Sequence, residues 1–203
     1  ESEPIKKAES PYGNTKQIGE EIIKDLVNSS SNFNAISLRY FNPIGAHPSA
    51  LIGELPIGIP QNLVPYITQT AIGKRNELTV FGDNYLTRDG SCIRDYIHVV
   101  DLAKAHIKSL EKLIKESSKN YYDAFNIGTG KGTSVLELIS CFESVSGKKL
   151  NFRIGERRKG DIAKCFADVS KANELLNWKS KHSIEDALLS SWNWEKHIKN
   201  EKL

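Results

Sequence analysis

A tyrosine and a lysine four residues apart are the first side chains in the sequence that could carry out chemistry. Tyr12 and Lys16 stand in the segment Tyr12-Gly13-Asn14-Thr15-Lys16, and this spacing puts both on one face of a helix. A free tyrosine has a pKa of about 10, and a neighbouring ammonium lowers that pKa by favouring the phenolate. The pair could therefore take a proton from an alcohol and return it. Surface helices often carry a tyrosine and a lysine at this spacing by chance. On spacing alone, we favour a chance pair over a catalytic one.

Three glycines form the second candidate, a turn that could bind a phosphate. Gly128, Gly130 and Gly132 follow the predicted strand at residues 125–127 and precede Ser134. A dinucleotide-binding turn has the spacing G-x-G-x-x-G, and here the third glycine comes one residue too early. We therefore favour a tight structural turn that leads into a helix capped by Ser134.

Basic side chains form the third candidate, a site for an anion. Arg94 stands alone, whereas the others lie in the run Arg157-Arg158-Lys159-Gly160-Asp161. Arginine presents a planar fork that suits phosphate oxygens, and the glycine would let the backbone approach a ligand. On charge alone, however, a solvated basic turn is the favoured interpretation of this run.

The overall composition limits what these candidates can be. The 203 residues carry a net charge of +3, with 39% hydrophobic and 26% charged residues, which is typical of a soluble globular protein and excludes disorder. Charges of both signs are interspersed, so we expect no nucleic-acid partner. No run reaches the roughly 18 apolar residues of a membrane helix, so we expect no membrane partner.

Cys92, Cys141 and Cys165 have unrelated spacings, which favours reduced thiols in a cytoplasmic protein. The histidines lack the spacing of metal ligands, so we expect no metal.

Alternating helices and strands must position the candidate residues, which predicts an α/β fold. Helical apolar spacing predicts helices at residues 12–27, 62–73, 101–115, 134–146, 170–176 and 183–198. Short segments that contain aliphatic and aromatic residues predict strands at residues 35–41, 78–81, 93–99, 125–127, 150–154 and 165–169. Residues 42–61 contain four prolines and three glycines, which predicts a long functional loop without a regular element. We expect Asp101 to cap the helix that follows it.

Five segments in this order resemble the UDP-glucose 4-epimerases of the extended short-chain dehydrogenase/reductase family. They are Ser10-Pro11-Tyr12-Gly13-Asn14-Thr15-Lys16, Arg39-Tyr40-Phe41-Asn42-Pro43-Ile44-Gly45-Ala46-His47-Pro48-Ser49, Gln61-Asn62-Leu63-Val64-Pro65-Tyr66-Ile67, Arg94-Asp95-Tyr96-Ile97-His98-Val99 with Asp101-Leu102-Ala103, and Arg157-Arg158-Lys159-Gly160-Asp161. The resemblance covers the chain from about Ser10 to its end. It implies the carboxy-terminal part of a Rossmann-type parallel sheet domain plus a smaller α/β substrate-binding domain.

The resemblance also implies a reaction and a set of site residues. The reaction is inversion at C4 of a UDP-hexose through transient oxidation by bound NAD. Tyr12 would exchange the proton of the 4-hydroxyl, Lys16 would hold the nicotinamide ribose and keep Tyr12 acidic, and Phe41 would touch the cofactor. The implied substrate-binding residues are Asn42, Asn62, Leu63, Thr79, Val80, Phe81, Arg94, Arg158, Asp161 and Cys165. Arg94 and Arg158 would hold the phosphates, residues 79–81 and Leu63 would line the uracil site, and Asp161 would accept from the ribose hydroxyls.

Cys165 predicts the range of sugars. The family has a pocket residue four positions after the aspartate that corresponds to Asp161, and that residue is either a bulky tyrosine or a small side chain. The small side chain of Cys165 predicts room for a 2-acetamido group, so we expect UDP-N-acetylglucosamine and UDP-N-acetylgalactosamine to be accepted as well as UDP-glucose and UDP-galactose.

The family pattern also predicts how the chain is divided. We expect residues 1–44 to end the NAD-binding Rossmann domain, residues 45–203 to form mostly the UDP-sugar domain, and residues 93–127 to return partly to the Rossmann domain. The chain contains no methionine and lacks the family's first glycine-rich turn. We therefore expect a carboxy-terminal piece that is inactive alone and a homodimer when complete. Two alternatives are another nucleotide-sugar enzyme of the family, a dehydratase or decarboxylase, and a non-catalytic UDP-sugar-binding fragment.

Overall fold

The computed structural model describes residues 1, 8, 10–30 and 32–201, and its helices and strands alternate as an α/β fold requires. The helices are α1 (Pro11–Ser29), α2 (Leu63–Ala71), α3 (Val99–Lys115), α4 (Val135–Ser146), α5 (Ser170–Leu175) and α6 (Ile184–Glu201). The strands are β1 (Ala35–Tyr40), β2 (Asn42–Ile44), β3 (Leu78–Phe81), β4 (Ile93–Arg94), β5 (Tyr96–His98), β6 (Tyr122–Ile127), β7 (Thr133–Ser134), β8 (Phe152–Gly155) and β9 (Lys164–Cys165).

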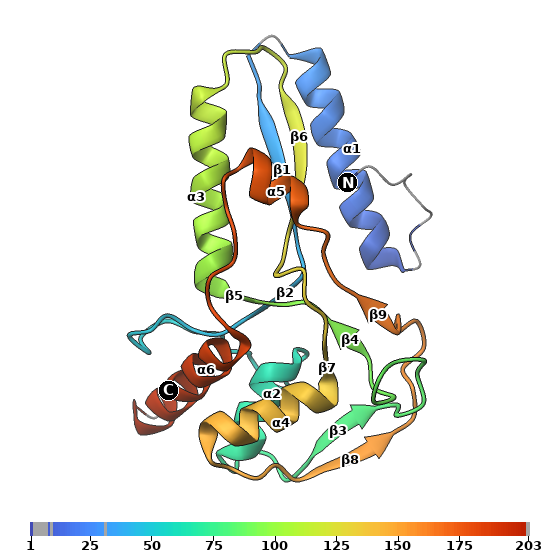
Figure 1. Ribbon diagram of the computed structural model, residues 1–203, viewed down its shortest axis with the longest axis vertical. Coiled ribbons are helices and arrows are strands. Elements are labelled where there is room, and N and C mark those ends of the chain that lie inside the picture. The colour runs from blue at the N-terminus through green and yellow to red at the C-terminus, as the bar shows by residue number, and fades with distance from the viewer. Residues whose placement is uncertain (2–7, 9, 31, 202–203) are drawn as a thin grey trace.

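Strands β1 and β6 form a parallel pair in the upper half of Figure 1, between α1 and α3. Their register runs from Ala35 opposite Tyr122 to Tyr40 opposite Ile127. Parallel strands need helices over both faces, because their crossover connections lie there. The buried cluster around this pair consists of Ile97, Leu102, Ala105, Phe125, Ile127, Ala172, Leu176 and Trp178. This half has the arrangement of a Rossmann-type sheet edge.

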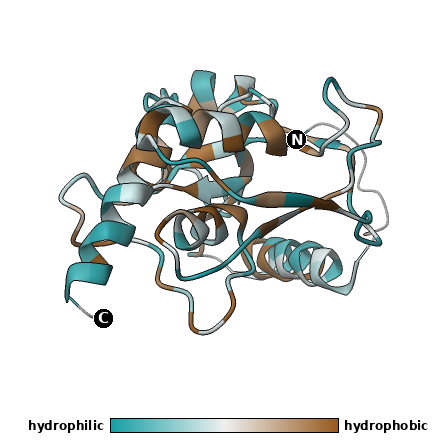
Figure 2. Cartoon of the chain, turned by 90° about the horizontal axis from the view of Figure 1, so that it is seen from below, coloured by the Kyte–Doolittle hydropathy of each residue, from teal (hydrophilic) through white to brown (hydrophobic). Residues whose placement is uncertain are grey.

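The lower half of Figure 1 contains two small sheets, with α2, α4 and α6 beside them. Strands β3 and β8 pair in parallel, and β4 lies between antiparallel β7 and parallel β9. The second buried cluster lies here and consists of Ile44, Val64, Ile67, Leu78, Val80, Tyr96, Leu138, Ile139, Phe142, Leu150, Ala187, Leu188 and Trp192. Figure 2 shows hydrophobic segments along strands that run between the helices. Burial of these apolar faces is the main force that holds the elements together.

Strands β2 and β5 join the two halves of the molecule. Asn42 pairs with Tyr96 and Ile44 pairs with His98 in a parallel register. The prediction that residues 42–61 contain no regular element was therefore wrong for residues 42–44. Proline usually argues against a strand because it donates no backbone hydrogen bond, but Pro43 is accommodated in this short ladder.

Two helices begin as their capping residues predict. The Ser10 side chain accepts from the backbone N–H of Gly13 at 3.0 Å, and Pro11 is the first residue of α1. Ser134 and Glu137 form a reciprocal capping box at the start of α4, with bonds of 3.1 and 2.8 Å. These local signals confirm the predicted starts of both helices.

Asp101 does not cap α3, so that prediction was wrong. The helix begins at Val99, and the Nδ1 atom of His98 accepts from the backbone N–H of Val100 at 3.0 Å. Asp101 lies inside the first turn with 1% of its surface exposed. Its carboxylate accepts from the backbone N–H groups of Lys181 and His182 at 2.8 Å and from His182 Nδ1 at 2.9 Å. Distant partners therefore determine the position of this residue.

The strand predicted at residues 165–169 was also misplaced, because β9 covers only Lys164 and Cys165. Two residues later the backbone N–H of Ala167 donates to the buried carboxylate of Asp95 at 3.2 Å. Asp95 directly follows β4, so a side-chain bond rather than a ladder bond attaches this part of the chain to the end of β4.

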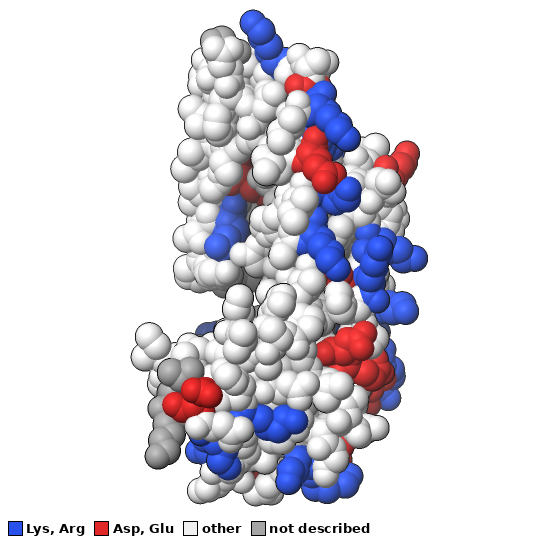
Figure 3. Space-filling model, turned by 90° about the vertical axis from the view of Figure 1, so that its left-hand side faces the viewer, with Lys and Arg blue, Asp and Glu red and all other residues white. Residues whose placement is uncertain are grey.

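The charged surface is mixed on the face that α3 covers. Figure 3 shows blue Lys and Arg side chains interspersed with red Asp and Glu side chains there. On α3 itself, Lys108 forms an ion pair with Glu111 at 2.7 Å. Within the described residues, no helix combines the length and the hydropathy needed to cross a membrane.

Candidate functional site

Two predicted phosphate ligands, Arg94 and Arg158, meet at the carboxylate of the predicted ribose ligand, Asp161. Arg94 Nη2 lies 3.8 Å from Asp161 Oδ1, and Arg158 Nε lies 3.5 Å from Asp161 Oδ2. We call Arg94, Arg158 and Asp161 the Asp161 cluster. The side chain of Arg158 is 59% exposed, whereas those of Arg94 and Asp161 are 20% and 28% exposed. The cluster therefore consists of one largely exposed and one mostly buried guanidinium group with a single carboxylate between them.

The pairing of β4 with β9 brings these residues together. Arg94 stands opposite Cys165 in the parallel register. The Nη1 atom of Arg94 donates to the carbonyl oxygens of Ile162 at 2.6 Å and Ile93 at 2.9 Å. These two bonds fix one side of the guanidinium, which leaves Nη2 directed toward Asp161. Cys165 is exposed beside the cluster.

The end of β3 supplies an aromatic surface next to the Asp161 cluster. Phe81 is 38% exposed, and Arg158 Cζ lies 4.3 Å from the centroid of its ring. Thr79 is half-buried, whereas Val80 has only 2% exposure and packs in the core. Of the predicted uracil-lining residues on this strand, Phe81 can present its side chain, and Val80 can present only its backbone.

The predicted amide ligands lie on other elements. Asn62 precedes α2, and its Nδ2 donates to Glu54 Oε1 at 2.7 Å. Asn42 is exposed on β2, and its backbone N–H donates to the carbonyl oxygen of Asp95 at 3.0 Å. Leu63 is half-buried against the lower core cluster. Among the described residues, no hydrogen bond or ion pair joins the side chains of Asn42 or Asn62 to the Asp161 cluster.

The predicted catalytic pair lies on the first turns of α1. Tyr12 is 72% exposed, and Lys16 Nζ lies 4.9 Å from the centroid of the tyrosine ring. The expected proximity of the two side chains is present, with the ammonium over the ring face. Phe41 is half-buried between β1 and β2, where its backbone N–H donates to Ile127 at 3.2 Å. The described residues include no hydrogen bond from the Tyr12 side chain to the Asp161 cluster.

A buried carboxylate next to Arg94 was missed by the sequence analysis. Asp95 is completely buried. Its Oδ1 accepts from Thr129 Oγ1 at 2.6 Å and from the Thr129 backbone N–H at 2.8 Å, and its Oδ2 accepts from the backbone N–H groups of Gly130 at 3.0 Å and Ala167 at 3.2 Å. Since each of these donors points at Asp95, the glycine turn binds the chain's own carboxylate. That agrees with its interpretation as a structural turn.

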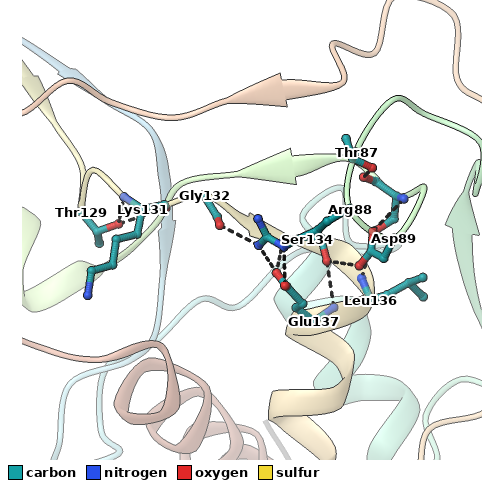
Figure 4. A network of polar contacts seen from close by, with 10 residues as sticks. Thr87, Arg88, Asp89, Thr129, Lys131, Gly132, Ser134, Leu136 and Glu137 are labelled. Atoms are coloured by element: carbon teal, nitrogen blue, oxygen red, sulfur yellow. Dashed lines mark hydrogen bonds and ion pairs between the residues drawn. The ribbon is translucent and has the colours of Figure 1, made fainter.

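A second network, also missed, attaches the loop before β4 to the start of α4 (Figure 4). Arg88 forms a two-bond ion pair with Glu137 and donates to the carbonyl oxygen of Gly132 at 2.8 Å. Asp89 accepts from the Ser134 hydroxyl. The Arg88 guanidinium, followed by the capping bond from Ser134, lowers the pKa of Glu137 to about 2 against the cost of partial burial. The network holds residues 88–89 in place a few residues before Arg94.

Tyr96 lies two residues after Arg94 and is buried. Its ring is 7% exposed, and burial raises the pKa of its hydroxyl above the usual value of 10. Tyr96 is therefore a neutral phenol that packs in the core rather than a base. Among the described residues, no three or more histidine, cysteine or acidic side chains are placed to hold a metal ion.

The sequence is similar to those of known proteins. Residues 1–190 match the family model described as GDP-mannose 4,6 dehydratase. The chain is 51% identical over 188 residues to a UDP-glucose 4-epimerase of Bacillus subtilis, which covers 93% of this chain and 55% of that protein. It is 46% identical over 200 residues to a UDP-glucose 4-epimerase of Drosophila melanogaster, with 98% and 57% covered. The chain thus spans about half the length of the curated relatives it matches.

Solved structures show the same similarity. A UDP-glucose 4-epimerase of Stenotrophomonas maltophila, with bound NAD and formylated UDP-arabinopyranose, superposes with a TM-score of 0.92 at 47% identity over 96% of this chain and 57% of that one. The enzyme of Bifidobacterium longum, in complex with NAD+ and UDP, gives a TM-score of 0.92 at 44% identity over 98% and 58%. These matches support the Rossmann-type assignment of the fold.

Proposed function

The chain belongs to the GDP-mannose 4,6 dehydratase family, and from this membership we propose that it supplies the substrate-holding part of a UDP-glucose 4-epimerase. The enzyme interconverts UDP-glucose and UDP-galactose with bound NAD. The observation that carries the proposal is the convergence of Arg94, Arg158 and Asp161 beside the exposed ring of Phe81. The relatives named UDP-glucose 4-epimerase at about 50% identity support it.

The Asp161 cluster suits a nucleoside diphosphate. Two guanidinium groups offer forked donors for phosphate oxygens, and the carboxylate between them keeps them in place while its free acceptor sites suit ribose hydroxyls. Phe81 and the backbone of residues 79–80, with Leu63, provide the surface for uracil. Asn42 and Asn62 add amide donors and acceptors for the sugar diphosphate. Firm binding of the nucleotide leaves the hexose free to turn.

The residues on α1 fit the nicotinamide end of NAD. Tyr12 and Lys16 form an exposed pair at the start of a helix, where a flat ring and its ribose could lie against them, and Phe41 follows the neighbouring strand. The glycine turn at 128–132 is not available to the pyrophosphate, because its amides bind Asp95. When bound, NAD supplies the acceptor and later donor of the C4 hydride. Tyr12 takes the proton of the 4-hydroxyl and returns it after the 4-keto sugar has turned, so protons and hydride balance over one cycle.

Turnover and nucleotide binding test separate parts of the proposal. In the complete enzyme that contains this chain, Tyr12→Phe should lower epimerisation by roughly 10²–10⁴-fold, the usual contribution of a general acid–base group, while UDP affinity measured by titration stays unchanged. Arg158→Ala should weaken UDP binding, and Arg153→Ala, a change on β8 outside the cluster, should not. Full turnover by Tyr12→Phe, or UDP affinity unchanged in Arg158→Ala, contradicts the proposal.

A sugar-nucleotide dehydratase is the second candidate, because the matching family model is described as a dehydratase. The two reactions give products of different composition. Epimerisation leaves the mass of the nucleotide sugar unchanged, whereas dehydration removes one water and leaves a 4-keto-6-deoxy sugar. Mass spectrometry of the reaction with UDP-glucose and with GDP-mannose separates them.

The exposed thiol beside Arg94 supports a broader sugar range. Cys165 stands opposite Arg94 in the β4–β9 register and is exposed, so a small side chain borders the site where the sugar would turn. The enzyme should epimerise UDP-N-acetylglucosamine as well as UDP-glucose. Cys165→Tyr should remove activity on the acetylated pair and spare the other, and equal loss on both pairs would contradict this role.

The division and assembly of the protein are further parts of the proposal. Residues 1–44 end the NAD-binding domain, residues 45–203 form mostly the UDP-sugar domain, and residues 93–127 return partly to the first. Ile18, Ile22 and Leu26 are 45%, 61% and 48% exposed on α1, which supports a homodimer through this helix in the complete protein. Light scattering after gel filtration measures the mass of the complete protein in solution and so tests whether it is a dimer. Three free cysteines support a cytoplasmic location.

A further inference from the structure

Two adjacent arginines after β8 take different partners. Arg157 Cζ lies 4.1 Å from the centroid of the Tyr85 ring, whereas Arg158 Cζ lies 4.3 Å from that of Phe81. Arg157 Nε also donates to Asn84 Oδ1 at 2.6 Å, and its Nη2 donates to the Asn84 carbonyl oxygen. Arg157 therefore binds the loop after β3, while Arg158 lies at the Asp161 cluster.

The contacts of Arg157 are closely packed around a glycine. The backbone N–H of Gly82 donates to the carbonyl oxygen of Gly155 at 2.9 Å. A Cβ atom at Gly82 would lie 2.7 Å from Arg157 Cγ and 2.7 Å from Tyr85 Cε2, and Gly82 has a φ of +82°. Only glycine allows the two side chains to meet over the backbone at this point. Tyr85 is 8% exposed, so the surface on which Arg157 stacks is itself fixed by burial.

Arg158 has weaker attachments than its neighbour. It is held by the stack on Phe81 and by an ion pair of 3.5 Å with Asp161, and its side chain is 59% exposed. A long exposed side chain loses rotamer freedom when it is confined to one position. The carbonyl oxygen of Arg158 accepts from the backbone N–H of Asp161 at 3.2 Å, which closes the turn on itself. The bonds of Arg157 to Asn84 and Tyr85 attach this turn to the loop after β3.

We propose that Arg157 is a positioning residue, which anchors the segment after β8 to the loop after β3 so that Arg158 is held over Phe81 and beside Asp161 for a nucleoside diphosphate. This inference rests on the proposed function, because it assigns the effect to the phosphate contact of Arg158. Arg157 itself is occupied by Asn84 and Tyr85 and contributes no contact to the nucleotide.

A double-mutant cycle with UDP as the probe tests whether Arg157 acts through Arg158. Titration of the purified protein should show UDP binding weakened about fivefold by Arg157→Lys, the size of one lost cation–π contact, because lysine keeps the charge but loses the planar fork. Arg158→Ala should weaken binding at least as much. In the Arg158→Ala background, Arg157→Lys should cause no further weakening.

Uridine and thermal stability separate positioning from general damage. Uridine lacks the phosphates, so its affinity should be the same in Arg157→Lys and in the unchanged protein, and the midpoint of thermal unfolding should shift by no more than in Arg153→Lys, a matched change on β8. Tyr85→Leu should reproduce the loss of UDP affinity. Tyr85→Phe should not, because it keeps the ring and removes a hydroxyl that is buried without a hydrogen-bond partner.

The outcomes distinguish this inference from the function on which it rests. If Arg158→Ala leaves UDP affinity unchanged, the proposed function fails and the inference with it. If Arg158→Ala weakens UDP binding but Arg157→Lys does not, the positioning role alone is overturned. Equal weakening by Arg157→Lys in both backgrounds, or an equal loss for uridine, also overturns it.

Discussion

Replacing Asp95 by asparagine measures how much stability depends on one buried carboxylate. The Oδ1 atom accepts two bonds from Thr129, and an amide oxygen can keep them. The Oδ2 atom accepts from the backbone N–H groups of Gly130 and Ala167, and the amide NH₂ that replaces it would face those donors. Two buried donors without partners cost about 1–3 kcal/mol each, so Asp95→Asn should lower the free energy of unfolding by roughly 2–6 kcal/mol.

This loss is large compared with the about 5–15 kcal/mol that stabilises a typical domain. Urea unfolding can be followed by the fluorescence of Trp178, Trp192 and Trp194, which are all buried. Asp83→Asn is the control, because Asp83 is exposed. A loss below about 1 kcal/mol in Asp95→Asn, with an unchanged dependence on urea, would refute the reasoning that this carboxylate organises the turn.

Three further predictions concern pH and backbone geometry. Arg88 holds the pKa of Glu137 at about 2, below its ordinary 4.5. The unchanged protein should therefore be more stable than Glu137→Gln by a full margin above pH 4.5, and this margin should shrink as the pH falls toward 2. The midpoints of urea unfolding measure it. Burial lowers the pKa of His98 below its ordinary 6.5, so the fold loses stability as the pH falls through 6.5 toward that lower pKa. His98→Asn, which can still cap a helix, should reduce this loss. Gly90→Ala should destabilise the protein by about 1–3 kcal/mol or more, because its φ is +80° and a Cβ would lie 1.7 Å from the Asp83 carbonyl oxygen.

Matched variants control these three predictions. Gly73 has a φ of +83° but no atom within 4 Å of a Cβ, so Gly73→Ala should cost less than Gly90→Ala, and equal costs would show that the close contact does not matter. Lys148 is exposed after α4, and Lys148→Gln should leave the acid part of the pH profile unchanged. A pH profile of His98→Asn that is identical to that of the unchanged protein would exclude His98 as the source of the loss.

The sequence correctly predicted the helix starts that depend on hydrogen bonds between neighbouring residues. Ser10 with Pro11 and Ser134 with Glu137 mark the starts of α1 and α4, because capping bonds form within three residues. Asp101 carries the same local signal, but its partners lie about 80 residues later. A residue type that caps helices can equally accept hydrogen bonds from a distant loop, and the sequence does not distinguish the two.

The candidate site was predictable only through the resemblance to a family. Charge alone favoured a solvated turn at residues 157–161, yet Arg158 and Asp161 meet Arg94 across β4 and β9. Asp95 gave no signal, since nothing in its neighbours indicates four distant donors. The different partners of Arg157 and Arg158 were equally hidden, because they depend on how the ends of β3 and β8 lie side by side.

The sheet that carries Arg94 has a consequence for biosynthesis. Its three strands come from distant parts of the chain, and Arg94 and Ile162 are joined across 68 residues. A contact between residues so far apart in the sequence requires a large loop to close before the contact contributes stability, so such contacts form slowly. A nascent polypeptide therefore cannot assemble the Asp161 cluster, or the β4–β9 pairing beside it, until the chain as far as β9 has left the ribosome.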